Sequence, residues 1–347
     1  MFAKINFHDE FYQKLKFLVL PITMQQFMLA LVSATDAIML GAVSQTSLSA
    51  VSLAGQIQFV LNLFISGISA GSGIMAAQYW GKQDVASIEE VMPIALRTNL
   101  IFSGAFTVFA AVAPEVLMRI FTSDPALIES GAIYLRAVSL SYLLCGISQI
   151  YLILLKNTGY AAASSRISCT AVIVNIIFNA ILIYGLFGMP ALGIQGAAYA
   201  TVAARLVELV WSYLETKRPG RVQIIWKKMF HAADAVLTKD FWRYTMPVLG
   251  AALVWGIAYV SYSVIMGHMG SDAVAANSIT TIAKNMLSCL IRGVSGGAGV
   301  LIGNLLGAGE LNRAKVYGGR LTRMAIVVGM TTGGLLMLIS PLIVRFA

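Results

Sequence analysis

Two glycine-rich stretches decide the fold: residues 67–73 read Gly-Ile-Ser-Ala-Gly-Ser-Gly, and residues 293–299 read Gly-Val-Ser-Gly-Gly-Ala-Gly. They belong to a longer repeat, because segment 21–84 matches segment 247–310 without a gap. Further matched positions are Pro21 with Pro247, Gly41 with Gly267, Ala50 with Ala276, Ser52 with Ser278, and Gly81 with Gly307. Glycine and proline are chosen for backbone geometry, so the repeat predicts two copies of one chain path. One position breaks the symmetry, because Asp36 in the first copy corresponds to Tyr262 in the second.

The composition is that of a membrane protein. Of the 347 residues, 58% are hydrophobic and only 11% are charged, and the mean hydropathy is +0.80. A soluble domain carries roughly 25% charged residues. The net charge of +9 does not indicate a nucleic-acid partner, because the basic residues lie in short connections between apolar runs. The three cysteines lie in apolar segments without metal or redox spacing, which predicts packing roles for Cys145, Cys169 and Cys289.

The apolar runs predict membrane-spanning helices, since a bilayer core of about 30 Å requires about 20 apolar residues per helix. Nine spans are expected, at 17–41, 50–78, 91–113, 131–155, 166–188, 192–214, 243–267, 276–303 and 321–344. Most lysines and arginines lie in the N-terminal tail and in the connections after every second span. This bias predicts a cytoplasmic N-terminus. The lack of a targeting peptide favours the bacterial inner (plasma) membrane.

The spans group into two lobes. Residues 1–16 are expected to form a cytoplasmic tail, 17–214 an N-lobe of six helices, 215–242 a cytoplasmic linker and 243–347 a partial C-lobe of three helices. The basic and apolar linker predicts a short helix on the anionic inner leaflet. Six spans separate the two repeat copies, so both cross in the same direction, related by an axis along the membrane normal. Because two six-helix lobes would give twelve spans, we expect a chain that is truncated in its second lobe.

Asp36 is the main candidate for chemistry. A carboxylate in the middle of a membrane span is costly, so it is expected to pair, to bind a cation or to be protonated. Burial favours the neutral form of a carboxyl and permits proton exchange near neutral pH, as a proton-coupled carrier requires. The alternative is a structural salt bridge, for which Arg205 is the nearest candidate. Arg205 and Glu208, three residues apart, are instead able to pair with each other.

Polar residues of the fifth and sixth spans are the next candidates. Asn175 and Asn179 lie four residues apart, on one face of a helix, and Thr201 lies in the following span. Their amide and hydroxyl oxygens suit a site for H⁺ or Na⁺ beside a carboxylate. Hydrogen bonding between helices explains the same residues equally well.

A substrate cavity is expected where the first and seventh spans face each other. Pro21 predicts a bend in the first span, which would change the space around Asp36. Aromatic and methionine side chains suit adaptable binding of apolar cations. The tentative cavity residues are Gln25, Met28, Trp255, Tyr259 and Tyr262. Packing and lipid contact remain alternatives for each of them.

The sequence has matches to an enzyme motif, but their surroundings do not fit an enzyme. Both glycine-rich stretches fit the hydrolase pattern G-x-S-x-G, which requires a strand-turn-helix setting and a histidine partner. Both lie in long apolar helices, and the histidines (His8, His231 and His268) lie in connections or at span ends. We interpret the stretches as small-residue packing sites that let helices approach closely. The sequence shows no phosphate loop, metal cluster or dinucleotide fingerprint, so we expect neither an enzyme nor a cofactor.

The chain resembles the multidrug and toxic compound extrusion (MATE) family of secondary transporters. The resemblance covers nearly the whole chain and is carried by Leu20-Pro21, Asp36 with Gly41, Ala50-Val51-Ser52, Gly67 to Gly81, Lys156-Asn157-Thr158-Gly159, Asn175 with Asn179 and Gly185, Gly193 with Gly196, and Gly270 to Asn277. It implies a two-lobed, twelve-helix antiporter that expels organic cations and amphipathic compounds in exchange for H⁺ or Na⁺.

The resemblance also implies an N-lobe ion site, which maps onto Asp36, Asn175, Asn179 and Thr201. Two departures matter. Asn179 stands at a position that is often acidic, and the seventh span lacks the acid that some members use. Coupling would then depend on Asp36 almost alone, and Na⁺ at this residue is the one metal interaction expected.

We therefore expect a cation-coupled (H⁺ or Na⁺) antiporter that exports organic cations or amphipathic drugs across the plasma membrane. It is expected to be a monomer, surrounded by membrane lipids and without a nucleic-acid partner. Two alternatives remain open. One is a flippase for lipid-linked saccharides, for which Lys284 and Arg292 would supply cationic side chains; the other is an inactive truncated fragment.

Overall fold

The computed structural model describes residues 10–230, 234–268 and 271–346, and this part of the chain is helical without strands. The nine long helices are α1 (Glu10–Val43), α2 (Gln45–Gly81), α3 (Val85–Val112), α5 (Pro125–Asn157), α6 (Ala161–Tyr184), α7 (Ile194–Thr216), α8 (Ala235–His268), α9 (Ser271–Gly307) and α10 (Leu311–Phe346). Three short elements, α4 (Pro114–Arg119), η1 (Leu186–Gly188) and η2 (Trp226–Phe230), lie in the connections. The predicted all-α class is confirmed.

Each expected span corresponds to one long helix. Among the described residues, eight helices are long and apolar enough to cross a membrane, which makes the chain a multi-pass membrane protein. The exception is α7, expected as the span at 192–214. It is a helix of 23 residues, but it carries Arg205 and Glu208 in its middle. Its apolar surface is therefore interrupted by an ion pair.

Side-chain caps fix several of the helix starts. At Ser44, the single residue between α1 and α2, the backbone is extended and the side chain accepts a hydrogen bond from the Ser47 amide at 3.0 Å. Asp84 caps α3 by accepting from the Ser87 amide at 3.1 Å, and Asp124 starts α5 in the same manner. These bonds satisfy amide groups that a helix start leaves without partners. The short connections make successive helices antiparallel neighbours.

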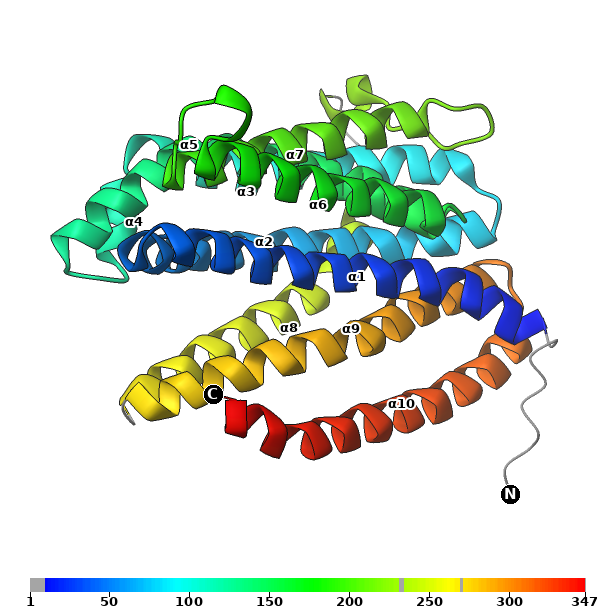
Figure 1. The fold of residues 1–347 in the computed structure, drawn as a ribbon. Coiled ribbons are helices and arrows are strands. Elements are labelled where there is room, and N and C mark those ends of the chain that lie inside the picture. The colour runs from blue at the N-terminus through cyan, green and yellow to red at the C-terminus, as the bar shows by residue number, and fades with distance from the viewer. Residues whose placement is uncertain (1–9, 231–233, 269–270, 347) are drawn as a thin grey trace.

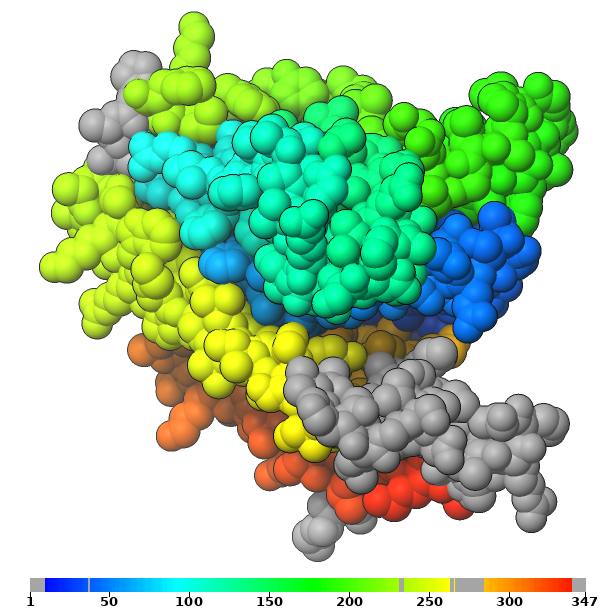
Figure 2. All heavy atoms as spheres, turned by 90° about the vertical axis from the view of Figure 1, so that its left-hand side faces the viewer, coloured from blue at the N-terminus to red at the C-terminus, as the bar shows by residue number. Residues whose placement is uncertain are grey.

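The helices form two groups (Figure 1). Helices α1–α7 pack into one bundle, whose core includes Ile68 of α2, Met92 of α3 and Ile150 of α5. Helix α8 lies against α2, and α9 lies against both α1 and α2. From the end where α1 begins, α8–α10 diverge from α1 and α2 toward the end that carries α4. Figure 2 looks onto that second end, with α8 (yellow) and α10 (orange to red) below the first bundle.

The repeat is visible as a twofold relation between the two groups. A Cβ atom added to Gly67 would lie 2.8 Å from the Leu249 Cα, so α2 and α8 touch through backbone. A Cβ atom added to Gly293 would lie 3.0 Å from the Thr23 Cα, so α9 and α1 touch in the same way. Shifting Gly67 and Thr23 by 226 positions gives Gly293 and Leu249. The two contacts are therefore equivalent, with the halves exchanged.

Other glycines of the repeat make further contacts of this kind. The equivalent pairs are Gly71–Thr245 with Gly297–Val19, and Gly81–Asn304 with Gly307–Gln78. Gly303 meets Ala77, its own equivalent, which places this contact on the pseudo-twofold axis. The predicted packing role of the glycine-rich stretches is confirmed, because in both copies they lie within continuous helices at close contacts.

The linker after α7 differs from the expected helix on the membrane surface. Among the described residues between α7 and α8, the helical part is the 3₁₀ turn Trp226–Phe230, and Val222, Ile224 and Met229 are buried in the core of the first bundle. The Trp226 indole N–H donates to the Tyr151 hydroxyl at 2.7 Å. Apolar side chains bind a membrane surface or an apolar protein surface equally well. Here the apolar linker residues pack on α3 and α5.

Candidate functional site

The four expected ion-site residues lie together in one hydrogen-bonded chain. The Asn179 amide nitrogen lies 2.5 Å from the Asp36 Oδ1 and 3.1 Å from the Asn175 Oδ1. The Asn175 amide nitrogen in turn lies 3.4 Å from the Thr201 Oγ1. The chain joins α1, α6 and α7. The helical spacing of the two asparagines places both on the face of α6 that lies between α1 and α7.

The site combines one carboxylate with uncharged oxygens. Asn179 and Asn175 are only 1% and 6% exposed, and Asp36 is partly buried. The Asn179 Oδ1 is buried and has no hydrogen-bond donor among the described residues, so it is an unused acceptor on the side chain that contacts Asp36. Such an oxygen beside a carboxylate is a ligand type that suits a hard cation.

The structural alternative for Asp36 does not form. Arg205, its nearest candidate partner, donates to the Glu208 Oε2 at 2.7 Å. Within the described residues no ion pair joins Asp36 to a basic side chain, and no group of three or more His, Cys, Asp or Glu is placed to hold a metal. Asp36 is therefore a carboxylate inside a membrane helix whose hydrogen-bond partner is a neutral amide.

The Asp36–Asn179 bond belongs to a longer contact between α1 and α6. The hydrogen bonds are Ser165 Oγ to Pro21 O (2.6 Å), Gln25 Nε2 to Ser168 Oγ (2.8 Å), Asn179 to Asp36, and Tyr184 OH to Met39 O (3.0 Å). The partners are separated in sequence by 144, 143, 143 and 145 residues. A constant separation means that the helices run parallel and in register, over about 27 Å at 1.5 Å per residue. The contact thus spans nearly the whole hydrocarbon thickness.

Comparison with known proteins decides the family. The family model MatE matches residues 21–181 and 247–347, which include both copies of the repeat. The chain belongs to the MATE family. An uncharacterized transporter YisQ of Bacillus subtilis is 24% identical over 85% of the chain and 64% of its own length. A probable multidrug resistance protein NorM of Agrobacterium fabrum is 25% identical over 80% of the chain and 59% of its own length.

Solved structures confirm the fold. A crystal structure of MATE in the bent conformation superposes with a TM-score of 0.85 at 20% identity, covering 96% of this chain and 74% of that one. The chain spans less than two thirds of the length of the two curated relatives named above. The MATE fold is therefore established for the described part of the chain.

The expected cavity residues of this MATE chain fall into separate environments. Gln25 is 6% exposed and donates to Ser168, so it belongs to the contact between α1 and α6 and not to a free cavity wall. Met28 is partly buried on the same helix. The structure therefore does not place Gln25 in one group with the aromatic residues of α8.

The aromatic residues of α8 form a cluster with a residue that sequence reasoning missed. Trp255 and Tyr259 stack with their ring centroids 5.6 Å apart, and Phe59 of α2 lies 5.5 Å from Tyr259. Trp255 is 52% exposed, and Tyr262 is 49% exposed one turn beyond Tyr259. The cluster therefore joins the two lobes and presents an accessible aromatic face. No sequence pattern distinguishes Phe59 from the other apolar residues of its helix.

Proposed function

We propose that this MATE chain is a cation-coupled antiporter that exports organic cations or amphipathic drugs, with Asp36 as the residue that binds the coupling ion. The observation that carries the proposal is the hydrogen-bonded chain from Asp36 through Asn179 and Asn175 to Thr201. A buried carboxylate without a basic partner is costly in a membrane unless a cation or proton visits it. The unused Asn179 oxygen on the side chain that contacts it favours the same conclusion.

The coupling ion would act by changing the bond between α1 and α6. While Asp36 is ionised, its bond from Asn179 is charge-assisted and therefore stronger than a neutral one. Binding of H⁺ or Na⁺ would remove that charge and weaken the bond. The outer half of α1 would then be free to bend away from α6 above Pro21, because proline already removes one hydrogen bond of this helix. This movement would change the space inside the N-lobe beside Asp36, and in the proposed antiport it would be coupled to release of the substrate.

An aromatic surface between α2 and α8 supports the proposed substrate class. The cluster of Phe59, Trp255 and Tyr259 between α2 and α8 offers aromatic faces, which attract organic cations through their quadrupoles. The relative NorM is named as a multidrug resistance protein, which supports the same class for this chain. We place no second carboxylate at the ion site, because an asparagine stands at position 179.

The proposal includes a location and an arrangement of lobes. The protein would lie in the bacterial inner membrane as a monomer, with the N-terminus in the cytoplasm, where most basic residues would then lie. The N-lobe, residues 17–214, would hold the ion site. The partial C-lobe, residues 243–347, would supply a substrate wall, and residues 215–242 would tie the lobes together. No cofactor takes part.

The test is transport by the whole chain in proteoliposomes. Ethidium movement would be measured with an imposed pH or Na⁺ gradient for the wild type, for Asp36→Asn, and for Glu129→Gln as an exposed-carboxylate control. We expect gradient-driven transport in the wild type and the control, and its loss in Asp36→Asn. Equal transport by Asp36→Asn would refute the ion site. Movement of a labelled lipid-linked saccharide in place of ethidium would favour the flippase alternative.

A further inference from the structure

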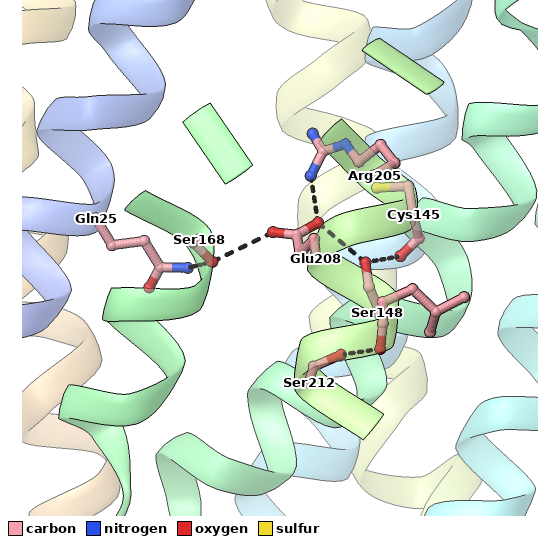
Figure 3. Close-up of polar contacts among 8 residues, drawn as sticks. Gln25, Cys145, Ser148, Ser168, Arg205, Glu208 and Ser212 are labelled. Carbon is pink, nitrogen blue, oxygen red and sulfur yellow. Dashed lines mark hydrogen bonds and ion pairs between the residues drawn. The ribbon is translucent and has the colours of Figure 1, made fainter. Parts of the chain in front are cut away.

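A second carboxylate lies inside the N-lobe, away from the proposed ion site. Glu208 of α7 is only 1% exposed. Its Oε2 accepts hydrogen bonds from Arg205 at 2.7 Å and from Ser148 of α5 at 3.1 Å, and its Oε1 accepts from Ser168 of α6 at 3.3 Å (Figure 3). A charge removed from water is tolerated only when it is paired and hydrogen-bonded, and Glu208 meets both conditions.

This arrangement reaches α1 through one hydroxyl group. The Gln25 Nε2 donates to the Ser168 Oγ at 2.8 Å, and Ser168 donates its own proton to Glu208 (Figure 3). A serine hydroxyl has a single proton, so giving it to the carboxylate leaves its lone pairs to accept from Gln25. The direction of both bonds is therefore set by the negative charge of Glu208. Glu208 and Ser168 together thus link four helices, α1, α5, α6 and α7.

The same two helices carry both carboxylate contacts. Gln25 and Asp36 are separated by about three helical turns on one face of α1. Ser168 and Asn179, their partners on α6, have the same separation. The Ser165 hydroxyl also donates to the carbonyl oxygen of Pro21 at 2.6 Å, next to the Gln25 contact. The inner half of α1 is thus held to α6 by two bonds, and one of these depends on Glu208.

We propose that Glu208 is a positioning residue for ion coupling: through Ser168 it holds the Pro21–Gln25 turn of α1 against α6. The proposal rests on the proposed function of Asp36. If the inner half of α1 is fixed against α6, binding or release of the ion at Asp36 moves only the outer half of the helix. Without this fixed point, the whole helix would shift slightly instead of bending. Glu208 itself neither binds the ion nor contacts the substrate.

Ser168→Ala tests the proposal with little risk to folding, because it leaves the Arg205–Glu208 pair in place. Ser212→Ala is the matched control. Ser212 is buried, as Ser168 is, but it lies on α7 and donates only to a carbonyl oxygen of its own helix, at 3.0 Å. Ser168→Thr keeps the hydroxyl and should restore function. In proteoliposomes we expect the kcat of gradient-driven transport to fall roughly three- to tenfold in Ser168→Ala while KM stays within roughly twofold. The control should keep the wild-type kcat.

Hydrogen–deuterium exchange of α1 supplies a measurement that does not depend on transport. We expect Ser168→Ala to increase exchange around residues 21–28 and to leave exchange around residues 36–43 unchanged; Asp36→Asn should show the reverse. Wild-type kcat and wild-type exchange at residues 21–28 in Ser168→Ala would overturn the positioning role. If Asp36→Asn transports normally, the function proposed for Asp36 fails, and the exchange at residues 21–28 still decides whether Ser168 and Glu208 hold this turn.

Discussion

The contact between Gly303 and Ala77 permits a sharp test of the twofold packing of the lobes. These residues are equivalent positions of the repeat and meet on its axis. A Cβ atom on Gly303 would lie 2.7 Å from the Ala77 Cβ, while the nearest backbone atoms of Ala77 lie 3.8 Å away. Carbon atoms make ordinary contact at about 3.5–4.0 Å, so Gly303→Ala creates an overlap of about 1 Å with one methyl group only.

The expected magnitudes follow from this geometry. Overpacking by Gly303→Ala costs about 1–3 kcal/mol, and the better helix propensity of alanine offsets about 1 kcal/mol of it. Ala77→Gly costs about 2 kcal/mol, from lower helix propensity and a lost buried methyl group. Simple addition therefore predicts that the double variant loses about 2–4 kcal/mol. In the double variant the alanine and the glycine have changed places across the axis, so one methyl group again fills the contact. The twofold packing therefore predicts a loss of unfolding free energy near zero for the double variant.

The assay is thermal unfolding of the purified protein in detergent, followed by intrinsic fluorescence. Gly104→Ala is the control, because a Cβ atom at this α3 position meets nothing within 4 Å. Ala77→Gly should unfold at a lower temperature than the wild type, Gly303→Ala at a lower temperature than Gly104→Ala, and the double variant close to the wild type. A double variant as unstable as the sum of the single ones would refute the twofold contact, as would a Gly303→Ala protein as stable as the control.

Three further variants test the N-lobe and its edges. Arg313→Gln breaks an exposed ion pair that joins α10 to Glu10 of α1 at 2.7 Å; the temperature of thermal unfolding should stay close to that of the wild type, and a large decrease would contradict the weak role of surface pairs. Asp84→Ala removes the α3 cap and should cost about 1 kcal/mol at pH 7. The hydrogen bonds from Ser87 lower the pKa of Asp84 from 3.8, so its contribution is present above that pH and is lost as the pH falls through the lowered value; equal losses at pH 7 and pH 3 would contradict this. Glu215→Gln leaves two linker arginines without their buried carboxylate, so trypsin should cleave the linker faster than in the wild type; unchanged cleavage would show that these pairs do not hold it.

The helices and their packing glycines were predictable from the sequence. Run length alone identified the nine long helices. Most of them extend beyond the expected span, but α6 ends at Tyr184, before the expected end at 188, and α7 starts at Ile194, after the expected start at 192. The glycines of the repeat identified the contacts between lobes, because only a residue without a side chain permits backbone contact such as that of Gly67 with Leu249. The family resemblance pointed to Asp36, Asn175, Asn179 and Thr201, which the structure joins by hydrogen bonds.

The pairing of α1 with α6 was not predictable in detail. A sequence pattern tells which residues share a helix face, but not which helix that face meets. A usable signal was nevertheless present, since Gln25 and Asp36 have the same spacing as Ser168 and Asn179. Gln25 was a cavity candidate because it follows Pro21, where a bend is expected to change the space around Asp36, and the sequence does not tell that Ser168 faces it. The linker was misplaced for a similar reason, because burial of Val222 depends on a protein surface that the sequence does not reveal.

The most direct test of the central claim is a measurement of ion displacement by substrate. Purified wild-type chain would be loaded with Na⁺ or equilibrated at pH 6–8, and release of ²²Na⁺ or of protons would be followed while an organic cation is added. The account predicts release of about one cation per chain in the wild type and in Glu129→Gln, and none in Asp36→Asn. Release of the same amount by Asp36→Asn would contradict the claim that Asp36 holds the coupling ion.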